Sequence, residues 1–362
     1  MKKSYLMIAA VALFAACASN DTFNEIDTDT PIVFEQSINK TTRAYIADKA
    51  ALADEGGFIV YGYKKATSAA NWNSYQTIFN NINVKSTNSG TSWSYDNLRF
   101  WDKTATYNFF AIAPYNPTTG TYSLVENSAP AALKFKITGA ASAISTSSDD
   151  YLIDRDGALA VDGSYTGTHA TVNFDFHHIM AKINFKLMST LTAGTITVTR
   201  LVMTGWNSGV GTFTQTLTAT PTTLVNTEWT IPTAGAGNIT LVGSGATDNE
   251  IEITCSASST VATAEEVSDW YIMVPQNIAA STLTFTVDFT YTDDNGTPSD
   301  NTDDYVETFT DQVATLTAAQ VWGTDSHTTY TLNIKPDPIV FDVTSICGFD
   351  VDGGQSTPID VK

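Results

Sequence analysis

The residue types that most often carry catalysis or bind metals are sparse in this chain of 362 residues. It has 4 histidines, and none stands at a metal-ligand spacing from a second histidine or a cysteine. No nucleophile-elbow, P-loop or dinucleotide-binding glycine pattern occurs, and the acidic turns near Asp149 and Asp293 do not fit a calcium loop. We therefore expect no catalytic residue, no metal site, no cofactor and no enzymatic activity. His177 and His178 lie between apolar runs, and we interpret them as structural residues at a bend.

One cysteine is placed for covalent modification. The chain begins with Met and two lysines, continues with a short apolar run over residues 5–14, and reaches Cys17 through two alanines. A run this short is typical of a signal peptide rather than of a membrane span. Small residues before a cysteine resemble a bacterial lipobox, although Phe14 stands where leucine is usual. We expect Cys17 to be lipidated and to become the first residue of the exported chain; a plain secretory signal is the alternative.

An arginine is placed for proteolysis. Arg43 lies in a polar stretch of Lys, Thr and Ala that a protease could reach. Cleavage after Arg43 would leave Ala44 as the new N-terminus. The alternative is that Arg43 is an ordinary residue of an exposed loop.

The composition indicates a folded β protein. Hydrophobic residues make up 43% of the sequence and charged residues only 15%, which is too apolar for a disordered chain. Thr, Ser, Asn and Gly are abundant, and β-branched and aromatic residues are frequent, as in all-β proteins with many turns. The net charge of −20 repels phosphate backbones, so we expect no nucleic-acid partner.

Alternation of apolar and polar residues predicts antiparallel strands. The clearest run starts at Thr282, where one face is apolar and the other is rich in Thr and Asp. Helical signals are weak: a short helix could pass through Ala51 and end at Gly56, and the segment from Thr310 could hold another short turn. The predicted apolar face of the run from Thr282 comprises Leu283, Phe285, Val287, Phe289 and Tyr291.

A long apolar segment that starts at Thr171 marks a division of the chain. It is too long for one strand, so two strands separated between His178 and Ala181 fit better. We expect an N-terminal β-sandwich domain over residues 44–179 and a C-terminal one over residues 180–336. The acidic stretch from Asp293 is interpreted as a solvated hairpin loop.

The tetrapeptide Pro-Ile-Val-Phe occurs near each end of the chain, at residues 31–34 and 338–341. In the first copy, taken as a strand, Ile32, Phe34 and Ile38 share one face and Val33 lies on the other. The second copy opens a C-terminal region, residues 337–362, that follows the last strong strand. The apolar residues that alternate in this region are Ile339, Phe341, Val343, Ile346, Phe349, Ile359 and Val361.

The two copies suggest that one strand replaces another. If cleavage after Arg43 removed the first copy, the domain would keep a groove with unpaired backbone groups and an open apolar core, which is costly. A strand of the same pattern from another molecule would restore both. Such a contact is head-to-tail and does not close on itself, so it generates a fibre.

The chain resembles the fimbrillins, the subunits of type V pili. The resemblance rests on the signal ending at Cys17, on "IVFEQSINKTTRA", "RFWDKTATYNFFAIAPY", "FDFHHIMAKINFKL" and "WYIMVPQ", and on their order along the whole chain. It implies two tandem transthyretin-like antiparallel β-sandwich domains. It also implies export as a lipoprotein, cleavage after Arg43 by an arginine-specific surface protease, and polymerisation through a C-terminal donor strand. The segment "TSICGFDVDGG" departs from the tryptophan-containing ending that this family would lead us to expect.

The resemblance therefore implies a structural subunit of the pilus shaft that supports adhesion. Its expected parts are a lipoprotein signal (1–17), a propeptide with the removable strand (18–43), the two domains, and the donor-strand region. Its expected partners are copies of itself, other pilus subunits, the protease, and host glycans or proteins. The expected location is the outer membrane and then the cell surface. The alternatives are a pilus tip adhesin and a surface lipoprotein that binds glycans without polymerising.

Overall fold

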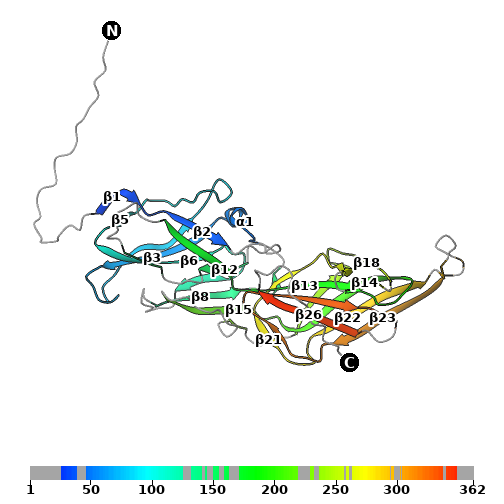
Figure 1. The fold of residues 1–362 in the computed structure, drawn as a ribbon. Coiled ribbons are helices and arrows are strands. Elements are labelled where there is room, and N and C mark those ends of the chain that lie inside the picture. Colours follow the sequence, from blue (N-terminus) through cyan, green and yellow to red (C-terminus); the bar gives the residue numbers. More distant parts are fainter. Residues whose placement is uncertain are drawn as a thin grey trace, which may run out of the picture.

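The computed structural model shows an elongated molecule built almost entirely of β-strands (Figure 1). The first strands lie toward one end, and β26 (Val340–Gly348) lies in the other half. Within the described residues no helix is long and apolar enough to cross a bilayer. The structure describes residues 26–38, 46–124, 132–140, 143–144, 150–154, 159–162, 171–218, 229–231, 236–256, 258–260, 263–293, 295–296, 302, 304–336 and 340–348.

Seven strands from the first half of the chain form one sheet. Its order is β2-β12-β10-β6-β3-β4, with β11 paired to β6 off this path. Because β2 ends this order, it has a neighbour on one side only among the described strands. The strands are β2 (Phe34–Ile38), β3 (Phe58–Ala66), β4 (Gln76–Val84), β6 (Ala105–Ala113), β10 (Leu152–Asp154), β11 (Leu159–Asp162) and β12 (Val172–His178).

The second half of the chain supplies most of two further sheets. A six-stranded sheet has the order β26-β25-β13-β20-β9, with β19 on β13, and a five-stranded sheet has the order β17-β14-β22-β23, with β18 on β14. The strands are β9 (Ala143–Ile144), β13 (Ala181–Met188), β14 (Thr195–Asn207), β17 (Ala236–Val242), β18 (Ile251–Thr254), β19 (Glu265–Glu266), β20 (Tyr271–Met273), β22 (Thr284–Asp293), β23 (Tyr305–Thr315) and β25 (Ser326–Asn333).

A four-stranded sheet joins strands from both halves of the chain, in the order β16-β15-β8-β7. Its central pair runs antiparallel from Gly211↔Ala140 to Thr218↔Ala132, so it connects segments on either side of the expected boundary at residue 179. Two smaller sheets pair β1 with β5 and β21 with β24. The strands are β1 (Ile26–Pro31), β5 (Phe100–Asp102), β7 (Thr121–Leu124), β8 (Ala132–Ala140), β15 (Gly211–Thr218), β16 (Trp229–Thr230), β21 (Gln276–Ile278) and β24 (Gln320–Trp322).

The buried apolar side chains form three clusters. One lies within the first half and contains Phe34 and Phe174, and another lies within the second half around Phe285. The third combines both halves, for example Ile112 with Phe213. We keep the division into two β-sandwich domains as a proposal, with the added feature that strands of one half complete a sheet of the other.

The all-β prediction is confirmed, and so are several local expectations. The division of the apolar segment falls between β12 and β13, and β22 and β23 flank the acidic loop as an antiparallel pair. The short helix is present as α1 (Lys49–Asp54), capped by Asp48, whose side chain accepts hydrogen bonds from the amides of Ala50 and Ala51. On the predicted apolar face, the side chains from Leu283 to Phe289 are buried and Tyr291 is half-buried.

Two expectations were wrong. The sheets are not purely antiparallel, because β2 pairs parallel with β12 and β25 pairs parallel with β13. The short turn expected from Thr310 is part of β23, where the pairing with β22 determines an extended backbone. Local sequence does not show strand direction, because direction depends on which distant strands become neighbours. The extended backbone from Thr310 likewise depends on a distant partner, β22.

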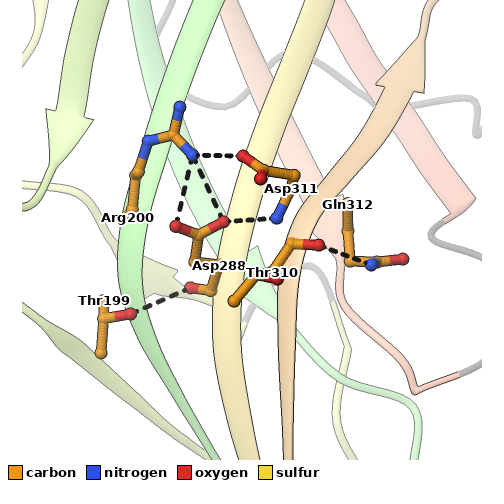
Figure 2. A network of polar contacts seen from close by, with 6 residues as sticks. All are labelled: Thr199, Arg200, Asp288, Thr310, Asp311 and Gln312. Atoms are coloured by element: carbon orange, nitrogen blue, oxygen red, sulfur yellow. Dashed lines mark hydrogen bonds and ion pairs between the residues drawn. The ribbon is translucent and has the colours of Figure 1, made fainter.

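A charged network holds a bulge in the five-stranded sheet (Figure 2). The register shifts between Val198 and Arg200 in β14, and again where β22 passes from Val287 to Phe289 opposite β23. Figure 2 shows the Arg200 guanidinium between two carboxylates, with Nη1 at 3.3 Å from Asp288 Oδ2 and 2.9 Å from Asp311 Oδ1. The Asp311 amide donates to Asp288 Oδ1 at 2.6 Å, and the φ of Asp311 is 52°, in the left-handed region. Strand β23, an edge strand, is therefore interrupted near its middle.

Replacing Phe285 with aspartate should destabilise the protein by about 4 kcal/mol or more, because the change both empties a core position and buries an unpaired charge. Phe285 is fully buried on β22, whereas its neighbour Thr286 is half-buried on the other face. Thr286→Asp is the matched control and should cost about 1 kcal/mol or less. Urea unfolding followed by tryptophan fluorescence measures both. Equal losses in the two variants would contradict the assignment of the buried face.

Candidate functional site

The first Pro-Ile-Val-Phe copy leads into β2, at the free edge of the seven-stranded sheet. Its register with β12 is continuous from Phe34↔Val172 to Ile38↔Phe176. The hydroxyl of Ser37 donates to Asp175 Oδ1 at 3.0 Å on the exposed side of the pair. Because β2 forms a ladder with β12 alone among the described strands, its departure would leave β12 as an unpaired edge. The segment that ends at Arg43 also contains β1, so its release would break the pairing of β1 with β5 as well.

The side chains from Ile32 to Ile38 alternate as the sequence predicts, but Ile32 and Val33 lie between β1 and β2 rather than within a strand. Ile32 is 1% exposed, Phe34 0% and Ile38 8%, whereas Val33 is 42% exposed. The Phe34 ring lies inside a cluster of aromatic side chains rather than at its margin. Without β2 the cluster would lose its centre, and the groove left beside β12 would be lined by aromatic rings. The ring centroids around Phe34 are those of Phe79 at 5.1 Å, Tyr95 at 5.5 Å, and Phe109 and Phe174 both at 5.7 Å.

A tyrosine binds the backbone two residues before this strand. The Tyr95 hydroxyl donates to the Ile32 carbonyl at 2.7 Å, and the Ile32 amide donates to the Arg99 carbonyl at 2.8 Å. Burial raises the pKa of Tyr95, so the hydroxyl keeps its proton for this bond at neutral pH. This contact could not be predicted, because the two partners are far apart in the chain and tyrosine is common in apolar cores.

The chain beyond the expected cleavage site is anchored independently of β2. Ile46 is fully buried, and its amide donates to Asp150 Oδ2 at 3.1 Å. The other oxygen of this carboxylate, Oδ1, lies 2.8 Å from His178 Nδ1, and both side chains are buried. A chain that began at Ala44 would therefore still be held from Ile46 onward. The interpretation of His178 as structural agrees with this position at the end of β12, but the sequence did not connect it with Asp150.

The second copy leads into β26, at the edge of the six-stranded sheet. Strand β26 runs antiparallel to β25, with Phe341 opposite Leu332, Val343 opposite Tyr330 and Ile346 opposite Thr328. The structure does not bring the two copies together, since β2 and β26 lie in different halves of the molecule (Figure 1). The other predicted site residues lie outside the described residues: Cys17, Arg43, Ala44, Ile339, Phe349, Ile359 and Val361.

A model of the fimbrillin-like family matches residues 42–347. The fimbrium subunit Fim1C of Phocaeicola vulgatus ATCC 8482 is 32% identical over 223 residues, which are 56% of this chain and 55% of that protein, so the chain spans about half the length of this relative. A crystal structure of a fimbrial protein from Bacteroides vulgatus ATCC 8482 aligns with a TM-score of 0.60 at 19% identity, over 88% of this chain and 99% of that one, and therefore shares the fold. Because the family model covers most of the chain, this protein belongs to the fimbrillin-like family.

Proposed function

We propose that this chain is a structural subunit of a cell-surface fimbrium that polymerises by exchange of an edge strand. The observation that carries this proposal is the position of the two related segments. Each leads into the strand at one edge of a sheet, and the first inserts Phe34 into an aromatic core. An edge strand can leave while the other strands of its sheet stay paired. Its absence exposes unpaired backbone groups and an apolar core, which a replacement strand would cover.

The proposed sequence of events begins with export. Lipidation of Cys17 would bring the precursor to the outer membrane, and an arginine-specific surface protease would cut after Arg43. Residues up to 43 would then be held by non-covalent contacts alone, while Ile46 stays bonded to Asp150. A subunit released in this way has an acceptor groove beside β12 and an intact C-terminal region.

The C-terminal region of a second copy, from about Pro338 onward, would fill the groove. Each buried Ile, Val or Phe of the incoming strand contributes roughly 1.5–3 kcal/mol, and the new ladder with β12 adds to this. The acceptor and the donor are different surfaces of the subunit, so repetition builds an open fibre. The chain would thus be a shaft subunit. Other pilus subunits would occupy the ends of the fibre, and the fibre would support adhesion to host glycans or proteins.

A disulfide between β2 and β12 tests whether β2 must leave. Glu35 and Asn173 are exposed register partners. Neighbouring strands lie about 4.8 Å apart, within the range that a disulfide can bridge. The oxidised Glu35→Cys/Asn173→Cys protein should be cleaved normally but should form no fibres, and a reductant should restore assembly. Electron microscopy and gel filtration of the cleaved protein measure this.

The matched control pairs Glu35→Cys with Asp175→Cys. The register partner of Asp175 is Ser37, so this diagonal pair lies about 8 Å apart and should not be bridged. The control should therefore polymerise under oxidising conditions. Fibre growth from the oxidised Glu35→Cys/Asn173→Cys protein would contradict strand release. A wild-type protein that is cleaved, stays monomeric and binds glycans would favour the non-polymerising lipoprotein instead.

A further inference from the structure

A buried amide sits in the middle of β2. Gln36 is 2% exposed and occupies the core-facing side between Phe34 and Ile38, opposite Phe174 of β12. Neither its side-chain nitrogen nor its side-chain oxygen has a hydrogen-bond partner among the described residues. Burying an unpaired amide in an aromatic core destabilises the state that contains it. Strand β2 therefore fits its own groove less well than an apolar strand of the same pattern would.

The second copy carries an apolar residue at the corresponding position. When the two Pro-Ile-Val-Phe segments are aligned, Val343 stands where the first copy has Gln36. The exposed positions keep their chemistry, because Asp342 stands for Glu35 and Thr344 for Ser37. The hydroxyl that bonds Asp175 in β2 is thus available again at Thr344.

The alignment continues past a bulge in β26. Its register with β25 passes from Thr344 directly to Ile346, so Ser345 is an extra residue in the strand. If the same bulge is kept in the groove, Ile346 reaches the register position of Ile38. The incoming strand then offers an apolar residue at every buried position of β2, from Phe341 through Val343 to Ile346.

We propose that Gln36 is a built-in weak point of β2 and that Val343 of a second copy of the chain replaces it, with the donor strand running in the same direction as β2. The exchange removes an unpaired amide from the core and keeps the exposed contacts, and both gains favour the fibre against the pairing with β25 that β26 must give up. This inference rests on the proposed function and adds to it the donor's register, its direction and the residue that makes the exchange favourable.

Gln36→Val tests the weak point in the departing strand. Without the buried amide, the cleaved N-terminal segment should dissociate at least about tenfold more slowly, and fibre growth should slow with it. Glu35→Val is the matched control, because it raises the β-propensity of the same strand on the exposed side. That control should release its segment at nearly the wild-type rate. Capture of the segment through an affinity tag after cleavage measures its half-life.

Val343→Gln tests the replacing strand. It should carry the unpaired amide into the fibre, so fibres should dissociate at least about tenfold faster in denaturant. Val340→Gln is the same substitution at the position that aligns with the exposed Val33, and it should leave fibre stability unchanged. Equal stability of Val343→Gln and wild-type fibres would overturn the proposed register.

Intersubunit disulfides test the direction. With a donor parallel to β12, as β2 is, Asn173→Cys should cross-link to Asp342→Cys, and Asp175→Cys to Thr344→Cys. A donor running the opposite way would instead favour Asn173 with Thr344 and Asp175 with Asp342. The second pattern, or no cross-link in either, would overturn this inference. The Glu35–Asn173 lock tests the proposed function separately: if that lock blocks assembly while Gln36→Val and Val343→Gln behave as wild type, exchange stands and the role of Gln36 does not.

Discussion

A subunit in which Arg43 is replaced by alanine should remain a folded, soluble monomer that forms no fibres. The reason is topological: as long as residues 26–38 are covalently joined to Ile46, β2 rebinds beside β12 at a high effective concentration and outcompetes any strand from another molecule. The wild-type protein, treated with an arginine-specific protease, should begin at Ala44 and assemble. N-terminal sequencing and electron microscopy of both proteins measure these outcomes.

Arg43→Lys separates cleavage from charge. It keeps the positive charge but removes the side chain that an arginine-specific protease recognises, so it should fail to assemble just as Arg43→Ala does. Normal fibre growth from Arg43→Ala would show that β2 need not be released. Assembly of Arg43→Lys but not of Arg43→Ala, with neither cleaved, would mean that the charge acts at an interface.

Truncation before Pro338 should convert the subunit into a terminator of fibre growth. The cleaved, truncated chain keeps the acceptor groove beside β12 but has no strand to donate. It should form no fibres alone, and a small molar fraction mixed with full-length protein should shorten the fibres in proportion. Length distributions from electron micrographs measure this effect.

The truncation also removes β26 from β25 and could disturb folding. A second, full-length variant therefore serves as a control. Phe341→Asp keeps the full chain but would place a charge at the register position of Phe34, among aromatic rings, which is strongly unfavourable. It should accept a strand and fail to donate one. Unaltered fibre length in the presence of either variant would contradict donation from this region.

Alternation in the sequence predicted the parts of the fold that depend on local pattern. The buried faces of the first copy and of β22 followed from period-2 spacing, and the division at residues 178–181 followed from the length that one strand can have. The pairing of β15 with β8 was not predicted, because no local signal tells a strand which distant strand it joins. The link from Ile46 to Asp150 spans 104 residues and was missed for the same reason.

Gln36 was missed for a different reason. Its spacing from Phe34 placed it on the buried face, but a hydrophobic pattern treats a polar residue at such a position as an interruption. Burial of an amide without a partner is visible only once the surrounding side chains are placed. In families that exchange strands, a polar residue at an expected core position of an edge strand therefore merits attention as a candidate for function.

The bulges of the other long edge strands would keep fibres of the proposed kind from pairing side by side. In β23 the register is interrupted where Asp311 takes a left-handed backbone beside Arg200, and in β4 a similar shift surrounds Asn81, with φ of 55°. A neighbouring molecule that tried to add a strand there would meet a broken row of donors and acceptors. The edge beneath β2, by contrast, is regular along its described length. In a fibre built by the proposed exchange, growth would thereby be directed along one axis, and sideways fusion of fibres into sheets would be disfavoured.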